Sequence, residues 1–486
     1  MMPFLWPVLL AGAAAGEDEV QTQVRRLAEA YAIVESEAAD RIIPEKAFYE
    51  GILPGMLRRL DPHSVFFDPG QFEQLRKMQE SKAKGFGTIV SVLPGRVIIL
   101  QTFPGTPAAR GGLSAGDEIV TLNGVRLERL DVDQLIGLLG QSRRQIVNLD
   151  VRKPGNARLI QITLTPEEMQ SPSVERAFLL RPGVGYVRIG SFDEKTGEQA
   201  REAIEKLGGQ ALKVLVLDLR NNPGGLMPAA LETASLFLPP GKALVTVRGR
   251  ATAAKEEKVP ADARPYEFPV AVIVNERSAS GAEIVAGSLQ DHDRAVIVGA
   301  PSFGKGLVQT VFPLSEGTGM ALTTAYYYTP SGRTIQKPLR GGQLESAPPP
   351  MNETPKEYRT ASGRLVKGGG GIEPDRIAGE ERLSRLQAVL EASGSFPTFA
   401  TEYVRSRSQV PADFEVTPAL LDEFQVWLSG RNIRPSVGEW SQAREWITNR
   451  LKTEIFNQTF GVARGDEIEA QRDPQIQAAL KALETK

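Results

Sequence analysis

A serine placed between a buried strand and a helix is the first group in this sequence that could do covalent chemistry. The apolar run Val-Ala-Val-Ile-Val at 270–274 predicts a buried parallel strand, and apolar residues recur at helical spacing from Ala282 to Leu289. Ser280 stands at the junction, where the first turn of a helix leaves backbone N–H groups without partners. Such N–H groups stabilise an oxyanion, so Ser280 is a candidate nucleophile. The alternative is that Ser280 is a helix N-cap.

A serine nucleophile needs a base, and the chain offers few. It has no cysteine and two histidines, of which His292 follows Ser280 by 12 residues, about 18 Å along a helix, and His63 lies in a distant N-terminal segment. A lysine can act as the base when its surroundings lower its pKa from about 10.4. Lys305 lies between two glycines after a second apolar run at 295–298, which returns the chain to the same sheet edge. Lys305 is therefore the candidate base.

The same segment partly matches the sequence motif of a phosphate-binding loop. Gly299, Gly304 and Lys305 have the spacing of its first part. The next residue is Gly306 where a serine or threonine would hold magnesium, and the following residues predict a strand. We therefore expect no nucleotide site.

The residues around Ser280 and Lys305 resemble a known catalytic signature. Ser-Ala-Ser280-Gly-Ala-Glu, Phe-Gly-Lys305-Gly and Gln309 are similar to the motifs of the carboxyl-terminal processing proteases, the S41 serine peptidases with a Ser/Lys dyad. The resemblance implies that Ser280 is the nucleophile, Lys305 the general base and Gln309 the residue that orients the lysine. Most members of the family have alanine where this chain has Gly281.

A second segment, residues 84–166, has the texture of a small β-rich domain. Short strands alternate with glycines, and Asn123-Gly124 predicts the turn of a hairpin. The segment resembles a PDZ domain, and the resemblance implies that Gly85, Phe86, Gly87 and Thr88 bind a peptide C-terminus. Arg152 matches a family arginine thought to couple the PDZ position to the dyad; the alternative is a solvated charge at a strand end.

Strands and helices alternate through residues 173–380, which predicts a mainly parallel sheet with right-handed crossovers. The turn Pro-Gly224-Gly225 opens a helix after the strand 214–218, and successive N–H groups there suit an oxyanion. By the family resemblance, Gly224 or Gly225 forms the oxyanion hole with Gly281. We expect an α/β protease core of the crotonase/ClpP type, in addition to the PDZ domain and helical segments at 17–83 and 381–486.

Composition excludes several classes of partner. A net charge of −2, with 24% charged and 41% hydrophobic residues in 486, is ordinary for two to four globular domains and gives no signal for nucleic acid. No metal or other cofactor is expected.

Residues 1–15 are apolar and end in Ala13-x-Ala15, which predicts a signal peptide without a basic start and export to the periplasm or another extracytoplasmic compartment.

The prediction is a serine endopeptidase whose PDZ domain binds the C-terminus of its protein substrates. Two alternatives stay open: a catalytically silent PDZ adaptor, and a crotonase-like acyl-CoA enzyme favoured by the sheet pattern alone. We expect the N-terminal helices to pack against the body or a second subunit, and the C-terminal helices to form a homodimer or shield the site.

Overall fold

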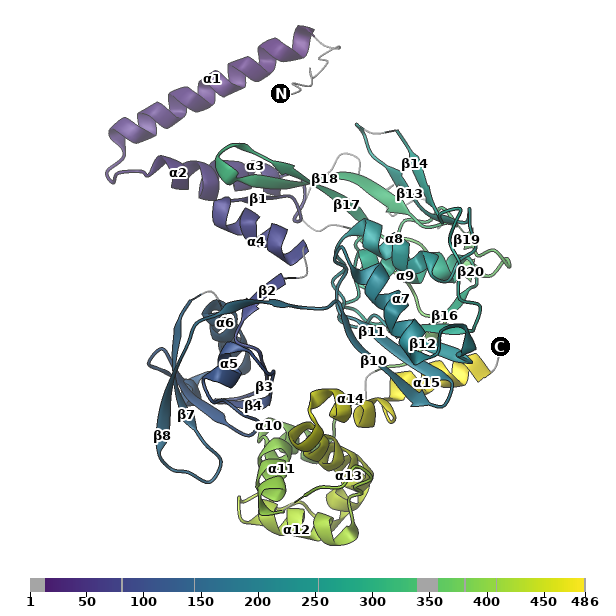
Figure 1. The fold of residues 1–486 in the computed structure, drawn as a ribbon. Helices are drawn as coiled ribbons and strands as arrows, with labels where there is room; N and C mark the ends of the chain where they lie inside the picture. The colour runs from purple at the N-terminus through teal and green to yellow at the C-terminus, as the bar shows by residue number, and fades with distance from the viewer. Residues whose placement is uncertain are drawn as a thin grey trace. The chain divides into compact units, whose positions relative to one another are not determined.

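The computed structural model describes residues 14–79, 82–143, 145–251, 253–338, 357–379, 382–407 and 409–484. The expected signal peptide lies outside these residues up to position 13, as do positions 339–356 of the glycine- and proline-rich segment 337–371. The described residues form two compact units: residues 14–72 and 309–323 belong to the first, and the other described residues to the second. Figure 1 shows the course of the chain.

The centre of the second unit is a six-stranded sheet of order β10-β11-β12-β15-β16-β21. Five neighbouring strands run parallel, as the sequence predicts, and β10 pairs antiparallel at one edge. The strands are β10 (Val174–Arg181), β11 (Val184–Ile189), β12 (Val214–Asp218), β15 (Val270–Val274), β16 (Ala295–Gly299) and β21 (Arg376–Ile377). The carboxyl ends of the parallel strands therefore meet at one edge.

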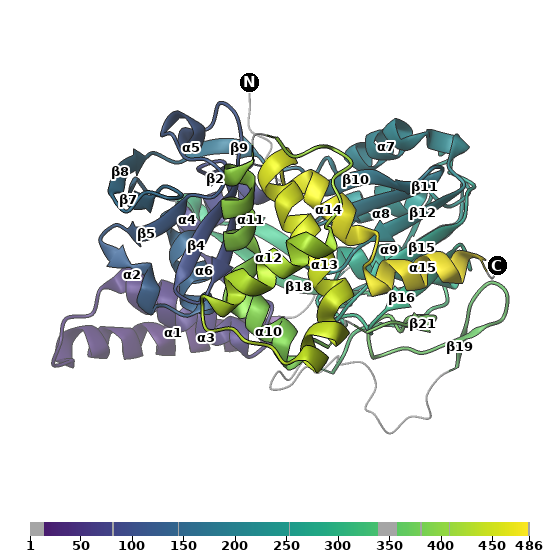
Figure 2. The same cartoon turned by 90° about the horizontal axis from the view of Figure 1, so that it is seen from below.

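Helices cover both faces of this sheet (Figures 1 and 2). On one face, α7 (Thr196–Leu207), α8 (Met227–Ser235) and α9 (Gly281–Asp291) bury alternate strand residues such as Leu217 and Val272. The opposite residues, such as Val216 and Ile273, pack against α15 (Pro474–Glu484), the last helix of the chain. The sequence pattern at the C-terminal end did not predict that α15 belongs to the core. Its buried Ile476, Ala479 and Leu480 make it one layer of the protease fold.

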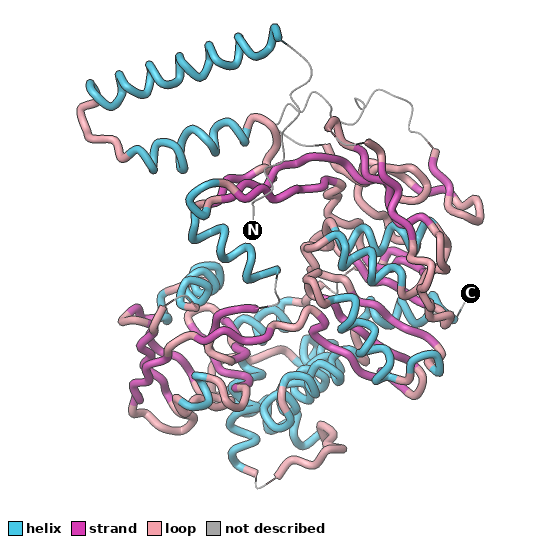
Figure 3. Tube along the Cα trace, turned by 45° about the horizontal axis from the view of Figure 1, so that its top comes forward, coloured by secondary structure: helices cyan, strands magenta, loops and turns pink. Residues whose placement is uncertain are grey.

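The PDZ segment forms a second sheet (Figure 3). Its buried side chains form a separate hydrophobic cluster. Its elements are β3 (Thr88–Leu93), β4 (Arg96–Thr102), α5 (Pro107–Arg110), β5 (Glu118–Leu122), β6 (Val125–Arg126), η2 (Leu127–Arg129), α6 (Val132–Ser142), β7 (Val147–Arg152) and β8 (Leu159–Leu164). The hairpin turn falls at Asn123 and Gly124, whose φ angles of 49° and 81° are those of a tight type I′ turn. A short ladder of β2 (Lys82–Gly85) and β9 (Glu167–Gln170) closes the segment.

Five helices follow the protease core and form an aromatic-rich cluster of their own. They are α10 (Arg385–Ala392), α11 (Ser395–Ser406), α12 (Pro418–Ser429), α13 (Val437–Phe460) and α14 (Val462–Ala470). This helical extension contacts the PDZ sheet, because Arg96 donates to Thr398 Oγ1 at 3.2 Å and Val462 N–H donates to Gln101 Oε1 at 2.9 Å. It also contacts the core through an ion pair between Arg176 and Asp466.

The first unit contains α1 (Ala14–Glu37), α2 (Pro44–Lys46), η1 (Ala47–Ile52) and α3 (Leu53–Arg58), and the boundary between the units falls within α4 (Pro69–Gln79). The strand β1 (Val65–Phe67) interrupts the helical segment expected at 17–83 and pairs with residues 319–321 of β18 (Gly319–Tyr328). No helix in the described part of the chain is both long and apolar enough to cross a membrane.

The remaining strands and turns are short. They are β13 (Ala243–Arg248), β14 (Lys255–Lys258), β17 (Leu307–Pro313), β19 (Tyr358–Arg359), β20 (Leu365–Val366), η3 (Gly209–Ala211) and η4 (Ser315–Gly317). Of these, β13 pairs with β14 and with the end of β18.

Candidate active site

Ser280 lies on a strained turn between β15 and α9. Its φ of 52° and ψ of −111° are values that a residue with a side chain rarely adopts. This turn lies at the carboxyl edge of the sheet, and Ser280 directly precedes the first N–H groups of α9. The side chain of Ser280 is partly exposed. A turn of this kind presents a hydroxyl to a substrate.

A buried glutamate holds this turn in place. Glu283 is fully buried, and one carboxylate oxygen accepts the Ser280 N–H at 2.9 Å and the Lys305 N–H at 2.8 Å. The other oxygen accepts the Gly304 N–H at 2.7 Å and the hydroxyl of Ser302. One side chain therefore fixes the backbones of both candidate dyad residues. Burial raises the pKa of Glu283, and its four hydrogen bonds oppose that rise.

Tyr327 provides a second link between the two segments. Its hydroxyl lies 2.7 Å from the Lys305 carbonyl and 3.1 Å from the Ser280 carbonyl, and can donate to either. Burial raises the pKa of Tyr327 far above its usual range, so the hydroxyl remains a donor. Backbone bonds add to this link, because Phe303 N–H donates to Ser278 O at 2.9 Å.

Gly224 lies directly against the nucleophile. A Cβ atom on it would be 2.7 Å from Ser280 Cβ and 2.8 Å from Gly281 N, so a side chain there would occupy the space beside both residues. The Gly224 N–H donates to Asn222 Oδ1 at 2.8 Å. In the described part of the chain, the N–H groups of Gly225 and Gly281 have no acceptor. Of the two glycines considered, Gly225 is thus the one whose N–H group has no acceptor among the described residues.

Lys305 follows a glycine that needs its backbone freedom. Gly304 has a φ of 91°, and a Cβ on it would lie 2.5 Å from Lys337 Cγ. The next amide, that of Gly306, donates to Gln336 Oε1 at 2.8 Å. These contacts fix the course of the chain on both sides of Lys305, whose side chain is partly buried.

The remaining candidate side chains lie as follows. Gln309, on β17, donates through Nε2 to the backbone carbonyl of His63. The His63 N–H is bonded to the buried carboxylate of Asp61 at 2.7 Å. The other histidine, His292, contacts the carbonyl of Ala243 through Nε2 at 2.7 Å, at the far end of α9 from Ser280.

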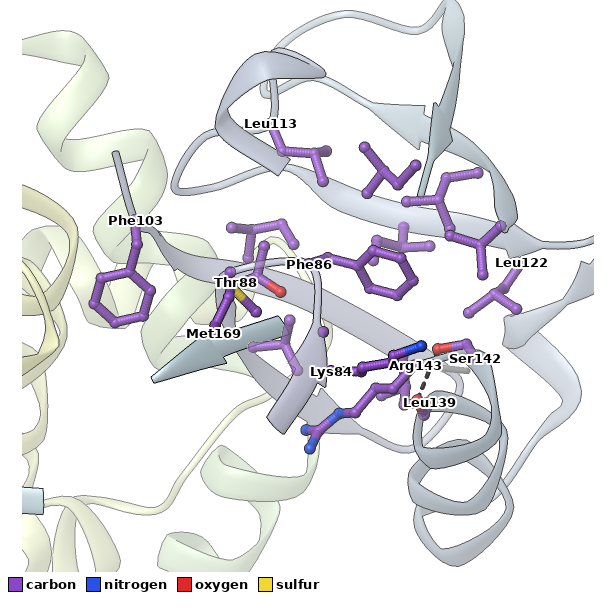
Figure 4. Close-up of a pocket in the computed structure, with 18 of the residues that line it drawn as sticks. Lys84, Phe86, Thr88, Phe103, Leu113, Leu122, Leu139, Ser142, Arg143 and Met169 are labelled. Atoms are coloured by element: carbon purple, nitrogen blue, oxygen red, sulfur yellow. Dashed lines mark hydrogen bonds between the residues drawn. The ribbon is translucent and has the colours of Figure 1, made fainter. Parts of the chain in front are cut away.

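The PDZ segment contains a cavity of about 250 Å³ beside its carboxylate-loop candidates (Figure 4). The carbonyls of Phe86 and Gly87 accept hydrogen bonds from Ala108 and Phe103, and among the described residues no acceptor pairs with their N–H groups. A Cβ on Gly87 would lie 2.3 Å from Thr106, so glycine is required there. Gly85, Phe86, Gly87 and Thr88 all line the cavity.

Two family models match the chain. Residues 183–342 match Peptidase family S41, and residues 99–153 match a PDZ domain. A carboxy-terminal-processing protease of Bartonella bacilliformis is 34% identical over 300 residues, which are 60% of this chain and 68% of that protein. One from Synechocystis is 34% identical over 58% of this chain and 67% of its own length. The chain belongs to the carboxyl-terminal processing protease family.

Two further proteins are similar to parts of this chain. The chloroplastic carboxyl-terminal-processing peptidase 2 of Arabidopsis thaliana is 33% identical over 57% of this chain and 56% of its own length. A solved photosystem II D1 C-terminal processing protease aligns with 74% of this chain and 86% of its own, at 27% identity and a TM-score of 0.41. The chain is thus a serine-type peptidase with an S41 core and a PDZ domain, as the sequence predicted.

The departure from the family at Gly281 has a structural setting. A Cβ on this residue would lie 3.0 Å from Phe192 Cδ2 and 3.3 Å from Ala230 Cβ. Both neighbours are buried core residues, so they leave little room for a side chain at position 281. Glycine here lets Phe192 pack directly against the start of α9.

Arg152, the relay that the family resemblance implies, takes part in a network of ion pairs on the PDZ sheet. Its guanidinium pairs with Glu118 at 3.0 Å, and Glu118 also binds Arg96 at 2.8 Å. Because Arg96 in turn donates to Thr398, this chain of contacts leads from Arg152 to the helical extension.

Glu283 is part of the motif that carries the family resemblance, but the motif predicted no role for it. The signal was available, because Ser280 and Glu283 have the spacing of a helix capping box, in which the acid reaches back to the N–H of the first residue. That the same acid also binds Gly304 and Lys305 depends on tertiary packing, which the local pattern does not contain.

Proposed function

We propose that this peptidase is an endopeptidase that recognises the C-terminal tail of a protein through its PDZ domain and cuts it with a dyad of Ser280 and Lys305. The observation that carries the proposal is the Glu283 carboxylate, which accepts the backbone N–H of both residues. An arrangement that fixes two segments 25 residues apart by one buried acid suits a pair of groups that act together.

The chemistry follows from the groups available. Ser280 Oγ attacks the peptide carbonyl carbon while neutral Lys305 takes its proton, and the oxyanion is bound by N–H groups of Gly225 and Gly281. Collapse of the intermediate breaks the C–N bond, and Lys305 gives the proton to the leaving amine. Water then hydrolyses the acyl-enzyme, with Lys305 again as the base. By resemblance to the family, we assign Gln309 the role of orienting the side chain of Lys305.

The setting of the reaction is part of the proposal. The apolar start of the chain supports export, and the substrates are proteins or peptides whose free C-terminus reaches the PDZ cavity. The relative from Arabidopsis is chloroplastic by name.

Cleavage of casein tests the proposal. We expect activity in the parent and a loss of about 10³-fold or more in both Ser280→Ala and Lys305→Ala, since a nucleophile and its base fail together. The matched controls are Ser315→Ala and Lys195→Ala, at exposed positions outside the site, which should keep parental activity. An active Lys305→Ala enzyme would show that another base is used.

A further inference from the structure

The short loop between β11 and α7 is fixed at both ends. At the end of β11, the Ile189 carbonyl accepts a hydrogen bond from Asn222 Nδ2 at 2.8 Å. Before α7, the Asp193 N–H donates to Thr196 Oγ1 at 2.8 Å, and both of these residues are buried. Phe192 lies between these two anchors, and its side chain is buried in the main hydrophobic cluster of the protease core. Its position is therefore well defined.

The backbone of Phe192 holds the turn that contains Gly225. The Phe192 N–H donates to the Gly224 carbonyl at 2.9 Å, and the Phe192 carbonyl accepts the Leu226 N–H at 2.8 Å. These two bonds form a parallel bridge between Phe192 and Gly225. A Cβ atom on Gly225 would overlap the Phe192 carbonyl oxygen, so the two backbones are in direct contact.

The ring of Phe192 packs against the other glycine assigned to the oxyanion. A Cβ atom on Gly281 would lie 3.0 Å from Phe192 Cδ2 and 3.5 Å from Phe192 Cγ. The same Cβ atom would lie 3.3 Å from the Cβ of Ala230, a buried residue of α8. The first residue of α9 is thus held between the ring and α8. One residue, Phe192, contacts both glycines.

We propose that Phe192 is a positioning residue that sets the spacing between the N–H groups of Gly225 and Gly281, through its backbone for the first and its ring for the second. The inference rests on the proposed function, in which these two groups bind the oxyanion. Hydrogen bonds to an oxyanion depend steeply on distance and angle, so a small shift of either glycine weakens them. Because the negative charge develops only in the transition state, the loss should appear in kcat and not in KM.

Steady-state cleavage of fluorescent casein by the full chain tests this inference. Phe192→Leu should lower kcat by about tenfold and leave KM within about twofold of the parent. The matched control is Phe237→Leu, because Phe237 is also buried in the same cluster but packs against Tyr266. We expect Phe237→Leu to lower the midpoint of thermal unfolding by a similar amount and to keep the parental kcat.

A paired substitution tests the contact between the ring and Gly281. Gly281 has no positive φ angle, so alanine there is opposed by its neighbours and not by the backbone conformation. Gly281→Ala alone should lower kcat by about tenfold or more, since the methyl group displaces the first residue of α9. With Phe192→Leu in the same chain the methyl group gains space, and kcat should return to within about threefold of the parent.

Three outcomes would overturn the role of Phe192 while leaving the dyad intact: parental kcat in Phe192→Leu, an equal loss of kcat in Phe237→Leu, or losses at positions 192 and 281 that simply multiply in the double variant. A change confined to KM would also contradict it. A Ser280→Ala enzyme that cleaves casein as fast as the parent would instead overturn the proposed function, and with it this assignment.

Discussion

At the scale of single residues, the site depends on one buried acid more than on any exposed group. Glu283 accepts four hydrogen bonds, three of them from backbone N–H groups that no other described side chain serves. A carboxylate is well matched to this task because it offers acceptors alone. An amide in its place would turn a donor toward other donors.

The pH dependence of stability should report this acid. Because burial raises the pKa of Glu283 above its ordinary value of 4.5, the folded state holds its proton at pH values where the unfolded chain has lost it. The free energy of unfolding should then fall as the pH rises from about 4.5 through the folded pKa. Glu283→Gln should remove this part of the slope and lower the unfolding midpoint, since each carboxylate oxygen accepts two hydrogen bonds and two donors would lose their acceptor.

The midpoints of thermal unfolding of the parent and the variant, measured from about pH 4 to about pH 8, test this prediction. Parallel midpoint curves for parent and variant would contradict the raised pKa.

At the scale of elements, strand ends and glycine turns place the reacting groups. The turn at Gly224 lies against Ser280 because both follow neighbouring parallel strands, β12 and β15. Position 224 requires glycine because a side chain would collide with Ser280, in addition to requiring its positive φ angle. Alanine substitutions can separate these two requirements.

Gly224→Ala should lower kcat for casein by about 10² or more, because its Cβ would intrude between Ser280 and Gly281 and disturb the oxyanion site. Gly241→Ala is the matched control. Gly241 also has a positive φ, 80° against 93° for Gly224, but no atom lies within 4 Å of its Cβ position. Equal losses in the two variants would mean that backbone strain alone explains the effect.

Local sequence patterns predicted the elements that carry the site but not the contacts between them. The strands 214–218 and 270–274 were found at their observed bounds, because fully buried parallel strands are unbroken apolar runs. The turn of Asn123 and Gly124 was found because its backbone angles demand those residues. The bonds of Glu283 to Gly304 and Lys305, and the pairing of Arg152 with Glu118, join segments far apart in sequence and have no local signal.

At the scale of the whole molecule, the helical extension packs against the other domains of the second unit. Its last helix, α15, covers a face of the catalytic sheet, and Arg220 at the end of β12 binds Asp473 and Gln475 just before and within it. Other helices of the extension contact the PDZ sheet at Gln101 and Arg96. The extension thus contacts both the sheet that carries Ser280 and the domain assigned to the tail.

Removing packing from α15 should therefore weaken the protease core. Ile476→Ala should lower the free energy of unfolding by about 2 to 5 kcal/mol, because the side chain is 1% exposed and the sheet leaves a cavity when it is removed. Val437→Ala, at a side chain that is 84% exposed on the same extension, should change it by less than about 0.5 kcal/mol. Unfolding in urea, monitored by the loss of activity, measures both changes in the free energy of unfolding. A neutral Ile476→Ala would mean that α15 contributes little to the core.

The dyad itself is tested most directly by covalent labelling of Ser280 with a fluorophosphonate, located by mass spectrometry in the parent, Lys305→Ala and the control Lys195→Ala. We expect one modified residue, Ser280, in the parent and in the control, and labelling slower by about 10³-fold in Lys305→Ala, since the serine then lacks its base. Labelling of Lys305→Ala at the parental rate, or modification of a different serine, would contradict this expectation.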